Sequence, residues 1–457
     1  MSWNNIKHKI ARFYSAIWKN IEPVKTVLLT LLIGLSIFLT WNLWTYTPNL
    51  QELPDGTIDS KIEQGVKTTV QDVIQPMKVI LHQNKKHYWS PSMGVGKQTE
   101  GVYERLQKAT LVAGDPLPID EVDELSEGFE VIFPTAVPAP ALQKVFEFSK
   151  ENPFSAEPGG IKTLYIYKKG KDWMVRFIPA ENENSKFVYE FQITDANHLT
   201  NIDDEYRSDL QVEELDRFEL NGKAFYLPKR GITLQSLNYR IDDLGIEPFV
   251  KLLLPQHVKI DESKFVGTKS FMQYYKDREI FVYTSPSIKT NQSDALEEHV
   301  TVQGMNFINS HTGWTDQFQL YEFSDANSNY EGYKNYKEIQ YRLTLNGFPL
   351  MDDALSLIEL EYSNQELYRY KRSLLVLDKP LQLEPTTVKL ENGAEVVRTL
   401  RQLSGNEINV KDITIGYYVD INDNRTVELI PAWYYKVGTA WKKINFDDNE
   451  LFENKGR

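Results

Sequence analysis

The sequence predicts an α+β protein with a single N-terminal transmembrane helix, followed by a multi-domain extracytoplasmic region of antiparallel sheets with packed helices. Three observations support this prediction: one long apolar run near the N-terminus, an unequal charge balance on its two sides, and a series of short strand patterns after it. No later segment has an apolar run of comparable length. Since a membrane span needs about 20 apolar residues, we expect the chain to cross the membrane once.

The apolar run extends from Val27 to Trp44 and contains no charged residue. A helix of ~18 residues is roughly 27 Å long, which is close to the hydrocarbon thickness of a bilayer. The run ends in bulky aromatic residues, which suit the headgroup level and make a poor site for signal peptidase. We therefore expect an uncleaved anchor over residues 24–46, with Trp41, Trp44 and Tyr46 as interface anchors. A cleaved secretory signal is the alternative.

Charge is distributed unequally around this run. Five basic residues precede it with a single acid, Glu22, and three acids follow it: Lys7, Lys9, Arg12, Lys19 and Lys25 on one side, and Glu52, Asp55 and Asp59 on the other. Because positive residues stay on the cytoplasmic side, we expect the N-terminus inside and the C-terminal bulk outside the cell membrane. Apolar residues at helical spacing predict a cytoplasmic basic amphipathic segment over residues 1–23. An ordinary positively charged flank is the alternative interpretation.

Composition limits the function classes. The formal net charge of −13 argues against a nucleic-acid or anionic-lipid partner for the extracytoplasmic part. Cysteine is absent, which excludes thiol catalysis, thiolate metal sites and a lipoprotein anchor. An exported chain without disulfides must be stabilised by packing alone.

Strand and helix patterns predict three extracytoplasmic domains. Helices and strands mix up to about residue 155, and the later sequence is rich in strands that follow one another with few helices between them. Such series favour antiparallel sheets over a wound parallel sheet. The expected organisation is a cytoplasmic basic amphipathic segment over 1–23, a transmembrane helix over 24–46, an N-terminal α+β domain over 50–155, a middle β-rich domain over 156–298 and a C-terminal β-rich domain over 299–446.

Hydrophobic periodicity places individual elements. Helices are predicted over residues 58–75, 103–112, 140–150 and 392–404. Strands are predicted over residues 77–82, 129–134 and 301–309, a hairpin over 163–179 that turns near Lys169–Gly170, and a hairpin over 412–436. Leu-Asn-Gly occurs at 220–222 and again at 345–347, each time before a strand pattern. These repeats predict two turns. They also raise the hypothesis of a duplicated module, although Asn-Gly hairpins are common.

Motifs for catalysis or metal binding are weak. The seven histidines do not form a two-histidine zinc helix, and no Gly-x-Ser-x-Gly elbow is present. Asp420, Asn422 and Asn424 have the spacing of a calcium loop, but Arg425 and Pro431 replace the required Gly and Glu. A polar turn between two strands explains this stretch better. We predict no catalytic, cofactor-binding or metal site, and therefore no enzyme.

The predicted membrane helix carries a pattern of small residues. Thr26, Thr30 and Gly34 are spaced four apart on one face, and Ser36 and Thr40 repeat this spacing on another. Small residues let two helices approach closely in lipid, where hydrophobicity gives no drive to associate. These five residues are therefore predicted to form a face for a partner helix. The alternative is that Gly, Ser and Thr are simply frequent in membrane helices.

Three stretches resemble the YycH family. They are LSIFLTWNLWTYTPN at 35–49, YRLTLNGFPLMDDALSLIELEY at 341–362 and VELIPAWYYK at 427–436. The resemblance extends from the anchor to about residue 446. The basic N-terminus is longer than is expected for this family.

This resemblance implies a non-enzymatic, membrane-anchored regulator of the WalK/WalR (YycG/YycF) two-component system. Its implied partners are a sensor histidine kinase of the WalK/YycG type and a single-pass regulator of the YycI type, both contacted at the membrane. The implied role is restraint of the kinase, which controls cell-wall metabolism. The alternative is an anchored extracytoplasmic cell-wall-binding protein or enzyme.

Overall fold

The structure is a computed structural model that forms two compact units, residues 1–62 and residues 63–457. It describes residues 25, 29–36, 65–90, 101–122, 126–151, 153–154, 160–180, 186–194, 196–208, 212–286, 299–326, 336–363, 366–381, 384–404, 409–422 and 425–446. In the first unit, residues 25 and 29–36 are helical, and the leucine and isoleucine side chains of 29–36 are exposed.

Within the described residues, no helix has both the length and the apolar character needed to cross a membrane. Most of the expected anchor over 24–46 lies outside the described residues, and so does the expected amphipathic segment over 1–23. Both stay predictions.

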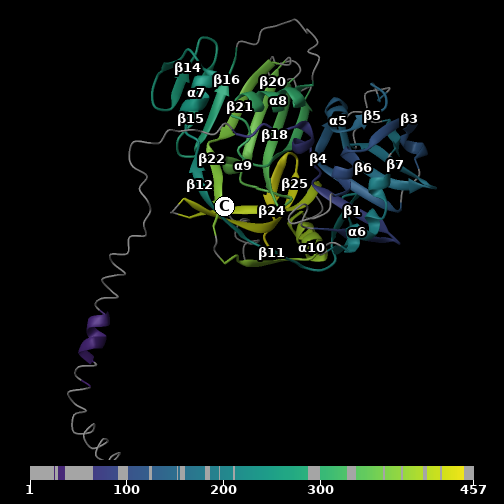
Figure 1. The fold of residues 1–457 in the computed structure, drawn as a ribbon, viewed down its shortest axis with the longest axis horizontal. Helices are drawn as coiled ribbons and strands as arrows, with labels where there is room; N and C mark the ends of the chain where they lie inside the picture. Colours follow the sequence, from purple (N-terminus) through teal and green to yellow (C-terminus); the bar gives the residue numbers. More distant parts are fainter. Residues whose placement is uncertain are drawn as a thin grey trace, which may run out of the picture. The chain divides into compact units, whose positions relative to one another are not determined.

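In its described residues, the second unit is an α+β structure with four sheets, as the strand series predicts. The largest sheet has ten strands in the order β10-β9-β2-β1-β4-β6-β7-β8-β3-β5, and Figure 1 shows β4, β6 and β7 as neighbouring blue strands. Its strands are β1 (Lys78–Gln83), β2 (Lys86–Trp89), β3 (Thr110–Pro118), β4 (Gly128–Pro138), β5 (Glu147–Phe148), β6 (Gly160–Lys169), β7 (Asp172–Pro179), β8 (Phe187–Thr194), β9 (Glu213–Leu220) and β10 (Lys223–Pro228). The helices along this part of the chain are α3 (Val70–Val73), α4 (Val102–Gln107), η1 (Ile119–Glu121), α5 (Ala139–Val145), η2 (Ala196–Leu199) and α6 (Ile202–Ser208).

A nine-stranded sheet follows, with the order β13-β14-β15-β16-β21-β20-β18-β17 and β19 paired to β18. Its strands are β13 (Val258–Lys259), β14 (Lys264–Val266), β15 (Phe271–Tyr275), β16 (Ile280–Thr284), β17 (Phe318–Ala326), β18 (Tyr336–Leu345), β19 (Phe348–Pro349), β20 (Leu357–Ser363) and β21 (Glu366–Ser373). The helices described in this part of the chain are α7 (Glu247–Leu253), α8 (Val300–Ser310) and α9 (Asp353–Ser356).

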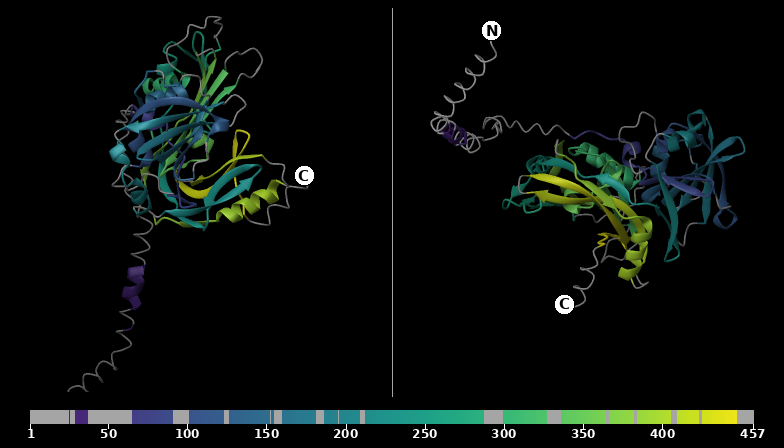
Figure 2. Two further views of the ribbon diagram at one scale, coloured as in Figure 1. Left: turned by 90° about the vertical axis from the view of Figure 1, so that its right-hand side faces the viewer. Right: turned by 90° about the horizontal axis from the view of Figure 1, so that it is seen from below.

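Two smaller sheets complete the second unit. A five-stranded sheet has the order β22-β12-β25-β24, with β26 paired to β25, and β11 pairs with β23. Their strands are β11 (Ile232–Gln235), β12 (Leu237–Asp243), β22 (Leu375–Pro380), β23 (Thr387–Leu390), β24 (Val410–Asn422), β25 (Thr426–Val437) and β26 (Ala440–Lys443). Helix α10 (Gly393–Ser404) contacts β9 and β10 of the largest sheet, and Figure 2 shows it as the yellow-green helix beside teal strands.

The predicted turns are confirmed. The hairpin of β6 and β7 closes with Lys169 opposite Asp172, and Gly170 has a φ of +67°. In both Leu-Asn-Gly motifs the Asn and the Gly have positive φ, which is typical of the tight turns that join antiparallel strands. The hairpin over 412–436 is β24 and β25.

One predicted strand is wrong. Residues 301–309 form most of helix α8, not a strand. His299 caps this helix by accepting a hydrogen bond from the Thr301 amide. The absence of a side chain at Gly304 lets α8 pack closely, since a Cβ there would lie 2.9 Å from Leu360 and 3.1 Å from Tyr341. Tertiary packing thus outweighs the β-branched composition of this stretch.

Three predicted helices are too long. In the described part of 58–75, only Val70–Val73 is helical; residues 65–69 are not, and Val66 pairs with Trp314. The helix predicted over 103–112 ends at Gln107, after which β3 begins and pairs with β8. The helix predicted over 140–150 ends at Val145, before β5. The helix predicted over 392–404 is confirmed as α10.

Buried side chains from all four sheets belong to one hydrophobic cluster. The expected domain borders near 155 and 298 stay predictions. Strands from both sides of each border are hydrogen-bonded neighbours: β4 pairs with β6, and β16 pairs with β21. Local alternation therefore defines the strands, while the sheets connect segments that are distant in the sequence.

Candidate interaction site

The predicted partner face lies in the first unit. Of its residues, Thr30, Gly34 and Ser36 are described and helical. Thr30 and Gly34 are about one turn apart and therefore share a face. A Cβ added to Gly34 would meet nothing within 4 Å, so the first unit leaves room beside this residue. The other predicted site residues lie outside the described part of the chain: Thr26, Thr40, Trp41, Trp44 and Tyr46. The partner face therefore stays a prediction.

The first described residues of the second unit form a junction that the sequence did not reveal. We call residues 65–75 the junction segment. Backbone and amide hydrogen bonds tie its start to the end of α8 and the turn after it. These bonds run from Gly65 N to Thr312 O, from Trp314 N to Val66 O at 3.1 Å, from Thr68 N to Asn309 Oδ1 at 3.0 Å, and from Asn309 Nδ2 to Thr68 O at 2.9 Å.

Two glycines permit this contact. Gly313 has a φ of +70°, in the left-handed region, and a Cβ there would lie 2.2 Å from the Gly65 carbonyl oxygen. A Cβ on Gly65 would in turn lie 2.5 Å from the Trp314 carbonyl oxygen. Real Cβ atoms do not approach backbone oxygens this closely. These two backbone segments can therefore meet only because neither glycine has a side chain.

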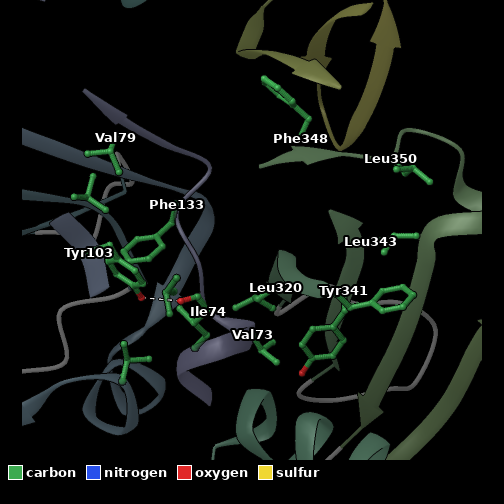
Figure 3. Packing of buried hydrophobic residues seen from close by; sticks show 14 of the residues in the cluster. Val73, Ile74, Val79, Tyr103, Phe133, Leu320, Tyr341, Leu343, Phe348 and Leu350 are labelled. Carbon is green, nitrogen blue, oxygen red and sulfur yellow. Dashed lines mark hydrogen bonds between the residues drawn. The ribbon is translucent and has the colours of Figure 1, made fainter. Parts of the chain in front are cut away.

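The end of the junction segment packs between the two large sheets. Thr69 and Asp72 form a capping box that starts α3, and this short helix contacts both α5 and β17. Figure 3 shows Val73 and Ile74 between Tyr103 and Phe133 on one side and Leu320 and Tyr341 on the other. The Tyr103 hydroxyl donates a hydrogen bond of 2.7 Å to the Ile74 carbonyl oxygen.

Charged side chains also join each of the two large sheets to the five-stranded sheet. Lys162 on β6 donates to the Pro134 carbonyl oxygen at 2.9 Å and lies 3.5 Å from Asp412 on β24. Lys436 on β25 pairs with Glu322 on β17. Burial lowers the pKa of Lys162, and Asp412 opposes this shift. These side chains form the junction charge cluster, defined by Lys162, Glu322, Asp412 and Lys436.

A buried arginine organises the turn that holds the junction segment. Arg372 on β21 is 1% exposed and donates to the Gly313 carbonyl oxygen at 2.8 Å and to the Thr315 hydroxyl at 3.2 Å. Burial raises the pKa of the neighbouring Asp316 carboxyl to about 7, against the lowering effects of the Leu377 amide and the Arg372 charge.

Replacing Asp316 by asparagine is expected to change how stability depends on pH. Because the Asp316 pKa in the folded state is about 7 and the ordinary pKa of an aspartate is 3.8, the folded state binds more protons between these two values, and stability falls as pH rises through this window. The variant should be more stable than the wild type by a few kcal/mol at about pH 8 and nearly equal at about pH 4. Urea unfolding at several pH values measures this difference. Parallel pH profiles for the two proteins would contradict the assignment.

Outside the junction, the described surface has a hollow between α10 and β9. It is lined by Phe218, Ala394, Val397, Arg398, Arg401 and Gln402. Among the described residues, no three histidine or acidic side chains are arranged to hold a metal ion.

The junction residues were missed because their contacts are not local. Thr68 and Asn309 are 241 residues apart, and the glycines of the contact have no motif of their own. A local signal did exist for another pair, His82 and His87, which flank a short turn. The histidines were considered only as candidates for a zinc helix, and this pair was not predicted.

Comparisons with known proteins agree with this architecture. Residues 22–209 match the model of the YycH protein N-terminal domain, and residues 222–450 match that of the YycH protein C-terminal domain. A curated relative, the "Two-component system WalR/WalK regulatory protein YycH" of Bacillus subtilis strain 168, is 19% identical over 91% of this chain and 94% of its own length.

A solved structure shares the fold. The crystal structure of YycH from Bacillus subtilis superposes with a TM-score of 0.64 at 15% sequence identity, covering 83% of this chain and 98% of that chain. The α+β, sheet-rich architecture is therefore shared by a known protein. Since the two family models match nearly the whole chain, the chain belongs to the YycH family.

Proposed function

We propose that this protein regulates a two-component system of the WalR/WalK type by protein contact, without catalysis. The observation that carries the proposal is its membership of the YycH family together with the description of the Bacillus subtilis relative as a WalR/WalK regulatory protein. Its partners are a sensor histidine kinase of the WalK type and a single-pass regulator of the YycI type. The contact restrains the kinase.

The predicted anchor supplies the contact in the membrane. The helical residues Thr30 and Gly34 offer small side chains on one face, and small residues allow close helix packing in lipid. A kinase with two accessible states needs only a few kcal/mol of differential binding to be shifted from one to the other. Packing of one helix against the kinase helices is of this order.

The extracytoplasmic body sets the geometry of the complex. The chain that follows the anchor enters this body through the junction segment, which contacts both large sheets. A change in either sheet therefore acts on the same short stretch of main chain. This arrangement supports a role in passing information between the body and the anchor.

Replacing Gly34 by isoleucine is expected to disrupt regulation while leaving the body folded, because a β-branched side chain blocks close approach on that face. Kinase-dependent transcription should rise toward the level of a deletion strain, and co-purification of the kinase should fall by about tenfold, which corresponds to ~1.4 kcal/mol of lost contact. Leu32→Ile is the matched control, since Leu32 lies about 160° away around the helix.

Two outcomes would count against the proposal. Unchanged transcription and unchanged co-purification in Gly34→Ile would exclude this face as the contact. Full control after replacement of residues 24–46 by polyleucine would exclude the anchor altogether. Specific binding to cell-wall material by that polyleucine protein would favour the alternative, an anchored cell-wall-binding protein.

A further inference from the structure

Two histidines face each other across a hairpin of the largest sheet. His82 on β1 and His87 on β2 are directly paired across the two strands. Their Nδ1 atoms are 2.6 Å apart, and Nε2 of His82 lies 2.9 Å from Oε2 of Glu130 on β4. His82 is 4% exposed, whereas His87 is partly exposed.

This geometry has room for one hydrogen between the two rings. The Glu130 carboxylate can only accept, so Nε2 of His82 carries a hydrogen and donates it. When His82 is neutral its Nδ1 is therefore an acceptor, and His87 donates. When His82 is protonated the direction reverses and the bond remains. If both rings are protonated, two N–H groups point at each other, and the rings must separate.

A metal ion does not fit between these nitrogens. Zinc–nitrogen bonds of about 2.0–2.1 Å in a tetrahedral site place two ligand nitrogens roughly 3.3 Å apart, which is longer than the 2.6 Å found here. The described residues also provide no third histidine or acidic ligand in a suitable arrangement. A shared proton is the species that this spacing accommodates.

The surroundings favour a pair with at most one extra proton. The ring of Tyr165 stacks on His82 with centroids 5.7 Å apart, and the ring of Tyr226 lies 5.1 Å from His82 and 4.5 Å from His87. Burial lowers the pKa of His87, and the charge of His82 lowers it further. The titratable and charged groups whose charge or contacts bear on the pair are Lys78 on β1, Lys86 on β2, Glu127 just before β4, Glu130 on β4, Tyr165 on β6, Arg176 on β7, Glu214, Asp216 and Arg217 on β9, and Tyr226 on β10.

We propose that His82, His87 and Glu130 form an extracytoplasmic proton-sensing site, in which a second proton breaks the His82–His87 hydrogen bond and moves His87 away from His82. The strand of His87, β2, lies between β1 and β9 in the sheet, and Tyr226 is on β10. Helix α10 packs on β9 and β10. A displaced His87 ring therefore disturbs the packing of α10, in the C-terminal part of the chain, on the largest sheet.

The direction of the pH effect follows from the lowered pKa of His87. The folded state favours the neutral His87 ring. The stability that this preference contributes is fully present above the ordinary histidine pKa of about 6.5 and is lost as pH falls below that value. Acidification is thus expected to loosen β2 and β9 first.

The test uses the full chain in lipid nanodiscs. Hydrogen exchange of the amides in β2 and β9, corrected for the intrinsic effect of pH, should rise about fivefold between about pH 7 and pH 5 in the wild type. The rise should be absent in His87→Gln, whose side chain cannot be protonated, and unchanged in the matched control His257→Gln. His257 bonds to the Leu254 carbonyl oxygen in another sheet region.

A measurement on the wild type removes any dependence on folding of the variant. Nuclear magnetic resonance of ring-labelled histidines should show His82 and His87 titrating in two coupled steps, with the second step changing both rings. Independent single-step titration of the two rings, or an equal fivefold rise in His87→Gln, would overturn the proposal.

The physiological readout rests on the proposed function. Kinase-dependent transcription in cells with His87→Gln should lose its response to external acidification. If the purified protein shows the coupled titration but transcription in wild-type cells does not depend on this protein at any pH, the proton site stands and the proposed regulatory function fails. If the coupled titration is absent, the proton site fails whatever transcription shows.

Discussion

Replacing Glu322 by glutamine is expected to lower the free energy of unfolding by about 3 kcal/mol, because the change leaves a partly buried ammonium without its partner. The Lys436 side chain is 10% exposed and pairs with Glu322, whose side chain is 19% exposed. The charge of Lys436 also acts on the nearby Lys162, whose pKa it lowers. Without Glu322, two lysines of the junction charge cluster would share Asp412. Denaturant unfolding measures the change.

An exposed pair provides the comparison. Arg217 and Glu219 lie 2.8 Å apart with side chains that are 49% and 67% exposed, and such a surface pair contributes little to stability because solvent screens its charges. Glu219→Gln should therefore have little effect. The double variant Glu322→Gln with Lys436→Met should regain part of the stability that Glu322→Gln loses, because no charge is then left unpaired. Equal losses for the two glutamine variants would contradict a buried junction.

The sequence predicts the strands well because each strand carries its own signal. Runs of apolar residues in β6, β7 and β24 reflect strands that are buried over much of their length, and the turn residues between strands need positive φ. Neither signal depends on distant residues. The helix α10 was also predictable, since Val396, Val397 and Leu400 repeat at helical spacing and are buried.

Elements decided by distant contacts were missed. Helix α8 has the β-branched composition of a strand and becomes helical where Gly304 packs on Leu360 and Tyr341. Residues 65–69 belong to a stretch with the apolar spacing of a helix but are not helical, and Val66 pairs there with Trp314. In both cases tertiary contacts outweigh local propensity, as is usual for short segments with mixed signals.

The residues of the candidate sites also differ in whether local sequence could predict their contacts. Cross-strand pairing of His82 and His87 was accessible in principle, because they flank the Asn84–Lys85 turn of one hairpin. The role of Glu130 was not, since it reaches the pair through the pairing of β1 and β4. The glycine contact of the junction segment joins the two ends of a long stretch of chain and leaves no local pattern.

Replacing Gly313 by alanine is expected to lower the free energy of unfolding by about 3 kcal/mol or more. A positive φ costs a non-glycine residue roughly 1–2 kcal/mol. The added Cβ would also lie 2.2 Å from the Gly65 carbonyl oxygen, so the junction segment must move away from the turn after α8. Thermal unfolding and protease cleavage within residues 65–75 measure the stability and the release of this segment.

Gly438→Ala separates the two causes. Gly438 has a φ of +62°, close to the +70° of Gly313, but a Cβ there would meet nothing within 4 Å. The two variants therefore share the conformational cost and differ in the close contact, so the difference between them measures that contact. If the segment also links the body to the anchor, Gly313→Ala should weaken control of the kinase, whereas Gly438→Ala should only lower stability. Identical behaviour of the two variants would show that the glycine contact contributes nothing beyond its backbone angle.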